Sequence, residues 1–385
     1  MNSGTEVFIA PPGPFSATVA VPGDKSLSHR ALIFAAMADG ESTIDGLAPG
    51  EDVASTAAVL SGLGVVIAGG RVASTGVGGW QAPPRALDCG NSGTTMRLLA
   101  GALAGRPFEA TLVGDASLMR RPMERIARPL ETLGARVSTS AGGTAPVIVR
   151  GGPLRGADVV IPVASAQVRS AVALAALQAD GATSIDSPPG FRDHTERRLE
   201  AEGRGRWVSE TRFVVDPGPF APGRSRVPGD PSSAAFLLAA AAMRADARVT
   251  VRRISLNPGR TGFLEVLVAM GTCVAVETTG TEGGEPIGDV TVTGGPLSGT
   301  EIGGALAVRC LDELPVLAVV AGIADGPTRI SGAGELRAKE SDRIAASVGL
   351  VTALGGQARA LPDGLEVAGG ASYRPAEVDG GGDHR

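Results

Sequence analysis

The sequence predicts an α/β fold of two similar domains, each containing three repeated units of helices and strands. Three regularities support this prediction. The tetrapeptide Val-Pro-Gly-Asp occurs at Val21–Asp24 and again at Val227–Asp230, 206 residues later. Helix-ending glycines recur at a step of about 70 residues, and a second type of helix start recurs with them. Because three glycine steps add up to about the 206-residue offset between the two tetrapeptides, we infer that three units make one domain.

One helix in each unit is expected to end at a glycine that is followed by strand-forming residues, such as Val65-Val66 or Cys273-Val274. Glycine just past a helix end adopts the left-handed conformation without steric cost. Successive steps of 70, 69, 68 and 84 residues separate these glycines, which are Gly64, Gly134, Gly203, Gly271 and Gly355. We therefore predict a helix before each glycine and a strand after it.

A second helix in each unit begins with small polar residues and continues into an apolar run. Ser, Asn and Asp suit this position because their side chains accept hydrogen bonds from the free N–H groups of the first turn. Apolar residues surround most of each helix, so we expect these helices to be buried inside the domains. The starts are Asp24–Ser26, Asn91–Thr95, Ser165–Gln167, Asp230–Ser233 and Asp312-Glu313.

The repeats place the first domain at residues 22–226 and the second at residues 1–21 plus 227–385, with crossovers near residues 21 and 227. A chain that crosses twice puts its first strand, Ser16–Val21, in the second domain. Gly381–Arg385 resembles a sixth helix start, and a further step of about 70 puts the sixth glycine near residue 425. We therefore expect an incomplete sixth repeat that lacks its final helix and strand, leaving part of the second core uncovered.

Composition favours a soluble globular protein, with 43% hydrophobic and 19% charged residues. A net charge of −5 argues against a nucleic-acid partner. We see no signal peptide and no membrane span, so a cytoplasmic location is expected. Three cysteines, Cys89, Cys273 and Cys310, lack the spacing of a metal or redox motif and are expected to be small buried hydrophobes.

Only two of the 35 lysines and arginines are lysines, Lys25 and Lys339. In a chain so biased toward arginine, they mark either chance or positions that need a compact ammonium group. The segment Pro22–Arg30 is a turn that opens a helix, where free N–H groups and the helix dipole favour an anion. Lys25, Ser26 and Arg30 add donors there, although a capped helix start with solvated cations fits the same residues. The spacing is not that of a Walker A loop.

Two further segments have the chemistry of an anion site. In the Gly-rich helix start Gly90–Arg97, glycine lets a ligand approach the backbone closely, although a tight turn is an equally good interpretation. Pro122 holds Arg121 in an extended conformation, where its guanidinium fork suits a carboxylate or phosphate. A solvated surface arginine is the alternative.

Acidic residues occur in two more segments. Asp312 and Glu313 precede an apolar helix, where a carboxylate either caps the helix or serves as a catalytic base. The segment Arg337–Arg343 carries five charges in seven residues, which is typical of a solvated face. We expect Lys339 and Arg343 to share one face of a helix, with Glu340 beside them.

Ten strings, in order and over essentially the whole chain, together resemble the 5-enolpyruvylshikimate-3-phosphate (EPSP) synthase family. They are PGDKSLSHR, GNSGTTMR, GDASLMRRPM, SAQVRSA, FRDHTER, VPGDPSSAAF, LNPGRTGFLEVL, DELPVLA, RAKESDR and GDHR. The resemblance implies two domains of three βαβαββ-type units, the inside-out α/β barrel of enolpyruvyl transferases, which close on the substrates. It also implies a cytoplasmic monomer that needs neither a metal nor an organic cofactor.

The implied reaction transfers the enolpyruvyl group of phosphoenolpyruvate to the 5-hydroxyl of shikimate 3-phosphate and releases phosphate, a step in chorismate and aromatic amino-acid biosynthesis. By motif position, the resemblance implies shikimate 3-phosphate ligands at Lys25, Ser26, Arg30, Ser165, Gln167, Arg192, Asp312 and Lys339. Its implied phosphoenolpyruvate contacts are Lys25, Gly93, Arg121, Gln167, Arg343 and Arg385.

The resemblance also implies the catalytic groups. Asp312 is expected to accept the 5-hydroxyl proton, while Glu340 and Lys25 handle protonation of the methylene carbon and its later reversal. Gly93 predicts sensitivity to glyphosate, because a methyl group there would crowd the phosphoenolpyruvate site.

The chain departs from the family pattern at three places. Phe191 stands where Ser or Thr is expected before Arg192, and Arg169 stands where Lys is common. A last helix, a last strand and a C-terminal lysine are also expected to be missing. A truncated, non-catalytic relative that only binds shikimate 3-phosphate is therefore a second hypothesis. A UDP-N-acetylglucosamine enolpyruvyl transferase is a third, but it should carry a loop cysteine and a Lys-Asn start, whereas Ser26 follows Lys25.

Overall fold

Five four-stranded sheets form the β-structure of the computed structural model, which describes residues 13–189, 192–339, 341–378 and 383. In each sheet the first two strands are parallel and the last two are added antiparallel. Each described sheet is open. This common order confirms the repeated α/β architecture.

The sheets are as follows, in strand order. The first is β13 (Arg224–Arg226), β2 (Asp39–Asp45), β4 (Arg71–Thr75) and β3 (Val66–Ala68); the second is β5 (Leu87–Asp88), β6 (Glu109–Val113), β8 (Val147–Arg150) and β7 (Arg136–Ser138). The third is β9 (Asp158–Val160), β10 (Thr183–Asp186), β12 (Arg212–Val215) and β11 (Gly205–Trp207). The fourth is β1 (Phe15–Ala20), β14 (Ala247–Ser255), β16 (Glu285–Thr293) and β15 (Cys273–Glu282); the fifth is β17 (Glu301–Ile302), β18 (Thr328–Ile330), β20 (Gly364–Val367) and β19 (Ala358–Leu361).

Helices connect the strands of each unit. They are α1 (Lys25–Met37), α2 (Glu51–Gly62), α3 (Gly93–Leu103), α4 (Glu124–Thr132), α5 (Ala166–Ala176), α6 (His194–Ala201), α7 (Pro231–Ala242), α8 (Gly262–Ala269), α9 (Gly304–Arg309), α10 (Leu314–Ile323) and α11 (Arg343–Ala353). Short 3₁₀ helices also occur at η1 (Val77–Gly79), η2 (Leu118–Arg120) and η3 (Gly334–Ala338). In the described ranges no helix is long and apolar enough to cross a membrane.

The predicted helix ends are confirmed. All five glycines have a positive φ, between 65° and 100°, and each is followed within three residues by a strand. Asp24, Ser92, Ser165 and Asp230 cap their helices by accepting a hydrogen bond from a backbone N–H of the first turn. Local hydrogen bonding and backbone sterics therefore set most of the boundaries.

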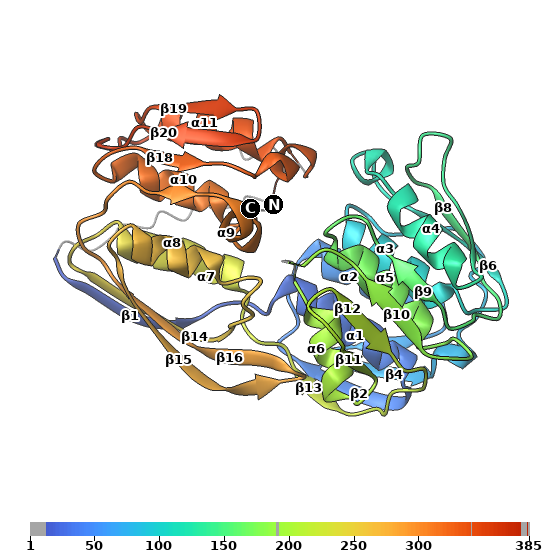
Figure 1. Ribbon diagram of the computed structural model, residues 1–385. Helices are drawn as coiled ribbons and strands as arrows, with labels where there is room; N and C mark the ends of the chain where they lie inside the picture. The colour runs from blue at the N-terminus through green and yellow to red at the C-terminus, as the bar shows by residue number, and fades with distance from the viewer. Residues whose placement is uncertain (1–12, 190–191, 340, 379–382, 384–385) are drawn as a thin grey trace, which may run out of the picture.

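The chain crosses between two lobes at the repeated Val-Pro-Gly-Asp segments (Figure 1). Strand β1 precedes α1 in the sequence but pairs with β14, whereas β13 precedes α7 but pairs with β2. At the crossing, the Asp24 N–H donates to the Pro228 carbonyl and the Asp230 N–H donates to the Pro22 carbonyl. The two copies of the motif thus hold each other, and each lobe receives its first strand from the other side of the crossing.

Each lobe has its own apolar core. One core contains buried residues between Leu32 and Val227, and the other contains buried residues between Ala234 and Val367. In the first lobe α3 packs against both α1 and α5. In the second, α7 packs against α10 but leaves the side chains of Phe236 and Leu237 exposed. Residues 368–378, which follow β20, form neither helix nor strand.

The predicted helix carrying both Lys339 and Arg343 is wrong. Helix η3 stops before Lys339, whose backbone is extended, and α11 starts at Arg343. The Asp342 side chain accepts hydrogen bonds from the N–H groups of Ile344 and Ala345, so it begins a new helix. A capping residue inside the charged run therefore interrupts the helical spacing that the charges suggested. Glu340 lies outside the described residues.

Candidate active site

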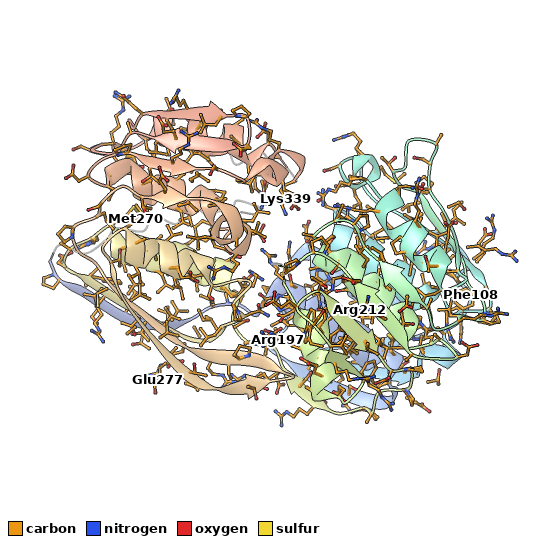
Figure 2. All side chains as sticks on the ribbon, viewed as in Figure 1. Phe108, Arg197, Arg212, Met270, Glu277 and Lys339 are labelled. Carbon is orange, nitrogen blue, oxygen red and sulfur yellow. The ribbon has the colours of Figure 1, made fainter. Side chains whose placement is uncertain are left out.

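A cavity of about 250 Å³, here called the central pocket, opens where the two lobes face each other. The first lobe contributes Arg97, Arg121, Arg125, Ser165, Gln167 and Arg192, and the second contributes Gly259, Leu311, Glu335 and Lys339. Figure 2 shows Lys339 at the edge of the second lobe that faces the first. Of the described side chains that line it, five are cationic and one, Glu335, is a carboxylate. Such a pocket favours an anionic ligand.

The wall contributed by α3 and the following loop holds two guanidinium groups beside Gly93. Arg97 Nη1 lies 2.5 Å from Gln167 Oε1, and the Gln167 amide donates to Thr94 Oγ1 at 3.0 Å. Arg121 Nη2 donates to Asn91 Oδ1 at 2.6 Å. The Arg121 backbone is extended, with φ −75° and ψ 146°, as Pro122 predicts. The residues predicted on this wall therefore lie together.

Asp312 lies between an arginine of each lobe. Its Oδ2 is 2.6 Å from Arg192 Nη2, and its Oδ1 is 3.1 Å from Arg343 Nη1. Arg343 also pairs with Asp383 at 2.9 Å. Glu313, rather than Asp312, occupies the position before α10, and its side chain makes no capping bond. The charges of Arg192 and Arg343 therefore hold Asp312 in place.

The predicted site residues at the start of α1 lie outside the lining of the central pocket. Lys25 Nζ pairs with Asp52 Oδ2 at 3.0 Å. Arg30 is only 5% exposed and donates to the hydroxyls of Thr195 and Ser170, each at 2.8 Å. Burial lowers the pKa of Arg30, although nearby carboxylates oppose this shift. Neither Lys25 nor Arg30 lines the central pocket in this structure.

Lys339 lies across the pocket from the first lobe. Its Nζ is 3.3 Å from Glu335 Oε1, and a quarter of its side chain is exposed. The other two residues predicted on this side, Glu340 and Arg385, lie outside the described residues. Among the described residues, no group of three or more His, Cys, Asp or Glu side chains is arranged to hold a metal ion.

Comparison with known proteins decides the family. The sequence pattern of EPSP synthase (3-phosphoshikimate 1-carboxyvinyltransferase) matches residues 9–385. The chain is 47% identical to a 3-phosphoshikimate 1-carboxyvinyltransferase of Herpetosiphon aurantiacus, over 95% of this chain and 87% of that protein. It is 46% identical to one of Xanthomonas axonopodis pv. citri, over 100% of this chain and 89% of that protein.

The chain belongs to the EPSP synthase family. The structure of EPSP synthase from Acinetobacter baumannii superimposes with a TM-score of 0.83 at 40% identity, covering 94% of this chain and 83% of that one. The enolpyruvyl transferase NikO from Streptomyces tendae shares the fold, with a TM-score of 0.68 at 19% identity over 93% of this chain and 83% of that one. These relatives confirm the fold class that the repeats predicted.

One buried cation of this EPSP synthase family member was missed by sequence reasoning. Arg260 is 1% exposed and joins the aspartates of both Val-Pro-Gly-Asp motifs, at 2.8 Å from Asp24 and 3.0 Å from Asp230. It also donates to the hydroxyl of Ser232, which in turn donates to Glu313. Its segment, LNPGRTG, contributed to the family resemblance but did not indicate a contact with Asp24, which lies 236 positions away. This network links the start of α1 to the start of α10.

Burial and neighbouring charges shift the pKa values of the carboxylates in this network. Burial alone would raise the pKa of Asp24, but the attraction of Arg260 and other cations and the Leu27 N–H bond lower it. Burial raises the pKa of Glu313, and the adjacent Asp312 adds to this effect while Arg260 opposes it. Asp24 is therefore held as a carboxylate beside Arg260, next to the predicted Lys25 and Ser26.

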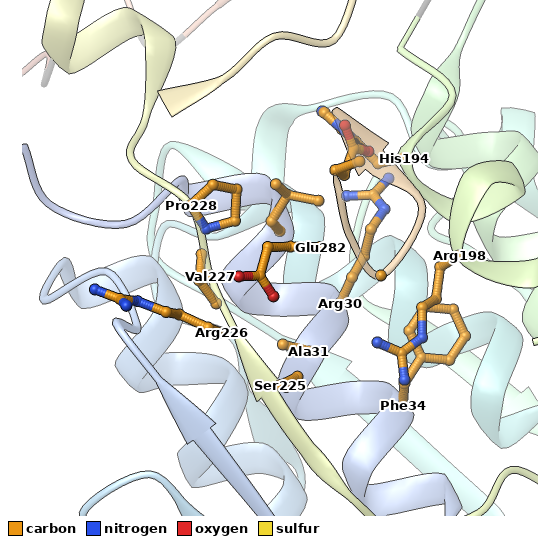
Figure 3. A pocket seen from close by; sticks show the side chains of 13 residues that line it. Arg30, Ala31, Phe34, His194, Arg198, Ser225, Arg226, Val227, Pro228 and Glu282 are labelled. Carbon is orange, nitrogen blue, oxygen red and sulfur yellow. Dashed lines mark hydrogen bonds and ion pairs between the residues drawn. The ribbon is translucent and has the colours of Figure 1, made fainter. Parts of the chain in front are cut away.

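A second, smaller cavity of about 50 Å³, here called the hinge pocket, lies beside the crossing (Figure 3). The turn between β15 and β16 brings Glu282 and Glu285 to Arg30 and His194 of the first lobe. His194 Nδ1 is 2.6 Å from Glu285 Oε1, and both side chains are at most 2% exposed. Arg198 stacks over the ring of Phe34 at 5.9 Å. The hairpin of the second lobe is thus anchored in the first.

Proposed function

We propose that this protein transfers the enolpyruvyl group of phosphoenolpyruvate to the 5-hydroxyl of shikimate 3-phosphate and releases phosphate. The observation that carries the proposal is the central pocket, where cations from both lobes converge. One of its lining residues, Arg192, also pairs with Asp312, which Arg343 holds from the other side. Both substrates are anions of the size and charge that such a pocket suits. Family membership and 46–47% identity to 3-phosphoshikimate 1-carboxyvinyltransferases support the same reaction.

For shikimate 3-phosphate we propose the ligands Lys25, Ser26, Arg30, Ser165, Gln167, Arg192, Asp312 and Lys339. Arg192 and Lys339 lie at the central pocket but are paired with carboxylates. The Arg30 guanidinium is committed to Thr195 and Ser170. Binding through all of these groups therefore requires the sugar phosphate to replace internal partners as the lobes approach. Charge-assisted bonds of about 1.5–3 kcal/mol each favour that replacement.

For phosphoenolpyruvate we propose contacts with Lys25, Gly93, Arg121, Gln167, Arg343 and Arg385. Arg121 and Gln167 line the central pocket beside Gly93, while Arg343 belongs to the other lobe. An arginine from each lobe can hold the phosphate and carboxylate ends of one small molecule in fixed orientation. The substrate would then complete the contact between the lobes and exclude water.

In the proposed mechanism Asp312 accepts the proton of the 5-hydroxyl as its oxygen bonds to C2 of phosphoenolpyruvate. A proton from Glu340 or Lys25 reaches C3, which leaves a tetrahedral carbon at C2. Loss of phosphate from C2 and of a proton from C3 then restores the double bond. Every step is proton transfer or addition and elimination, so no oxidant or metal is needed. We propose that the protein acts as a cytoplasmic monomer with domain boundaries at 22–226 and at 1–21 plus 227–385.

Replacement Asp312→Asn tests this assignment. We expect kcat for phosphate release from the two substrates to fall by about 10²–10⁴, as for loss of a general base, with the dissociation constant for shikimate 3-phosphate changed far less. The exposed Asp325 of the same lobe supplies the control, Asp325→Asn, which should leave kcat unchanged. A variant that retains more than half of the parental kcat would remove Asp312 from the mechanism.

The competing hypothesis is a relative that only binds shikimate 3-phosphate. Calorimetry with shikimate 3-phosphate, run beside the phosphate-release assay, separates the two. Turnover within a few-fold of the Acinetobacter baumannii enzyme supports the transferase, whereas binding without turnover supports the alternative. The third hypothesis required a cysteine at the pyruvyl group. None of the three lines the central pocket, and burial raises the pKa of Cys89 and also that of Cys310, to about 12.

A further inference from the structure

Arg125 is a cation of the central pocket that neither the motifs nor the proposed mechanism uses. It lies on α4, next to Arg121 and Arg97 on the same wall. Its Nε is buried and has no hydrogen-bond partner, and within the described part of the chain its side chain forms no ion pair. Arg128, one turn later on the same helix, is exposed and pairs with Glu124. Arg125 is thus a half-buried cation for which the described residues supply no ion-pair partner.

Glu335, on the opposite wall, is an acidic residue in a pocket whose described charged side chains are mostly cations. It lies on η3 and, among the residues that the structure describes, is the one carboxylate lining a pocket that also contains five cations. A carboxylate there opposes the binding of anionic substrates unless a cation neutralises it. In this structure it pairs with Lys339 at 3.3 Å, which occupies the ammonium group proposed to bind the shikimate hydroxyls. The Glu335 charge already acts on Arg125, because it partly opposes the lowering of the Arg125 pKa by burial.

We propose that Arg125 and Glu335 form a latch between the lobes, in which Glu335 leaves Lys339 for Arg125 as the lobes approach. The exchange has two consequences. It neutralises Glu335 with a guanidinium fork, which holds a carboxylate in a more defined geometry than an ammonium group does. It also releases Lys339 toward the sugar. Arg125 is therefore a positioning residue that acts through Glu335 and Lys339, and this inference rests on the proposed function.

The latch is tested by kinetics on Arg125→Gln, Glu335→Gln and the double variant. With the latch removed, Glu335 keeps Lys339, so Arg125→Gln should raise KM for shikimate 3-phosphate by about three- to fivefold, the range of a partly exposed ion pair, with kcat changed less. In the Glu335→Gln background the same replacement should have little further effect. The reciprocal variant Arg125→Glu/Glu335→Arg should recover most of the affinity lost in Arg125→Glu alone. Arg128→Gln is the matched control and should match the parent.

Additive effects of the two single replacements would overturn the latch, as would failure of the reciprocal variant to improve on Arg125→Glu. That pattern would instead place Arg125 in direct contact with a substrate. Recovery in the reciprocal variant also guards against misfolding as the cause of the loss.

A second measurement keeps the latch separate from the proposed reaction. Spin labels at Thr132→Cys on α4 and Thr352→Cys on α11, with the exposed Cys273 replaced by Ser, report the distance between the lobes. Addition of shikimate 3-phosphate and phosphoenolpyruvate should shorten this distance in the parent and in the reciprocal variant but less in Arg125→Gln. Closure without phosphate release would refute the proposed reaction and leave the latch standing. Equal closure in the parent and Arg125→Gln would refute the latch alone.

Discussion

Gly93 is a position where a single missing methyl group shapes the candidate site. A Cβ atom there would lie 2.9 Å from Arg97 Nη1 and 3.4 Å from Arg121 Nη1. Arg97 cannot move away without disturbing Gln167 and the Pro122 carbonyl, to which it is hydrogen-bonded. The methyl group would therefore act on the two guanidinium groups before it touched any substrate.

Replacement Gly93→Ala should raise KM for phosphoenolpyruvate roughly tenfold or more, because small displacements of positioning groups are costly. The inhibition constant for glyphosate should rise further, while KM for shikimate 3-phosphate changes little. Steady-state phosphate release measures all three constants. Gly152, which has open space around a would-be Cβ, provides the control Gly152→Ala. Equal glyphosate inhibition of parent and Gly93→Ala would contradict the steric argument.

His29 is a buried residue whose ionisation should govern the acid stability of the first lobe. Burial lowers the pKa of His29 to about 3, and Lys25 adds to this shift. Its Nδ1 lies 2.7 Å from Thr56 Oγ1, within a chain of hydroxyls that continues to Thr95. The folded protein therefore holds the imidazole neutral far below its ordinary pKa of 6.5.

Because the folded pKa is lowered, the stabilisation from a neutral His29 is present above pH 6.5 and is lost as pH falls from 6.5 toward 3. Unfolding free energy should decline by about 1.4 kcal/mol per pH unit below 6.5 from this group. His29→Gln should remove this slope between pH 6.5 and 5, above the range of most carboxylates. Urea unfolding followed by tryptophan fluorescence is suited to the test, because both tryptophans, Trp80 and Trp207, lie in the first lobe. Identical slopes would refute the assignment.

At the scale of elements, the repeated Val-Pro-Gly-Asp turns form a junction rather than two separate helix caps. Asp24 and Asp230 each cap a helix and also bind Arg260. Gly23 permits the close crossing, since a Cβ there would lie 1.9 Å from the Gly46 carbonyl oxygen. The junction therefore combines two features. The backbones approach so closely that no side chain fits at Gly23, and the buried aspartates depend on Arg260 for their neutralisation.

Arg260→Met should lower the unfolding free energy by about 3–5 kcal/mol, because it leaves two buried aspartates without their cation. Thermal and urea unfolding measure the loss. The exposed Arg252 of β14, whose nearest carboxylate is 3.9 Å away, gives the control Arg252→Met, which should cost at most about 1 kcal/mol. Adding Asp24→Asn and Asp230→Asn to Arg260→Met should recover part of the stability. A cost below that of the control would show that the aspartates find other partners.

Over the whole molecule, charge is distributed unevenly between the surface and the central pocket. The chain carries a net charge of −5, yet the described lining of the central pocket contains five cations and one carboxylate. The first lobe supplies four of the five cations, whereas the charge of Lys339 from the second lobe is balanced by Glu335. Anionic substrates are therefore attracted to the gap between the lobes even though the protein as a whole repels them.

Raising NaCl from about 0.05 to 0.5 M should raise KM for both substrates several-fold with a smaller change in kcat, because salt screens charges that are exposed before closure. A phosphate-release series across these concentrations measures the effect. Unfolding curves at the same concentrations serve as the control, since they show whether the protein itself is altered. KM values that do not depend on salt would mean that the pocket cations are already neutralised by their internal partners.

Sequence reasoning succeeded where neighbouring residues decide the outcome. The glycines after α2, α4, α6, α8 and α11 have positive φ, and four of the five polar helix starts supply caps, because both features depend on backbone sterics and hydrogen bonds within one turn. The prediction of one helix through the charged segment Arg337–Arg343 was wrong, and a local hydrogen bond is again the cause. The cap made by Asp342 outweighed the helical spacing of the charges.

The sequence by itself thus determined the repeated α/β units, the helix boundaries and the family. Only the tertiary structure decided which charges meet: Arg260 with both aspartates of the crossing, Asp312 with Arg192 at a separation of 120 residues, and Arg125 across the central pocket from Glu335. Local patterns encode hydrogen bonds within a turn. Contacts between distant cations and carboxylates depend on how the chain crosses between the lobes. These charges are buried together only when both cores have formed.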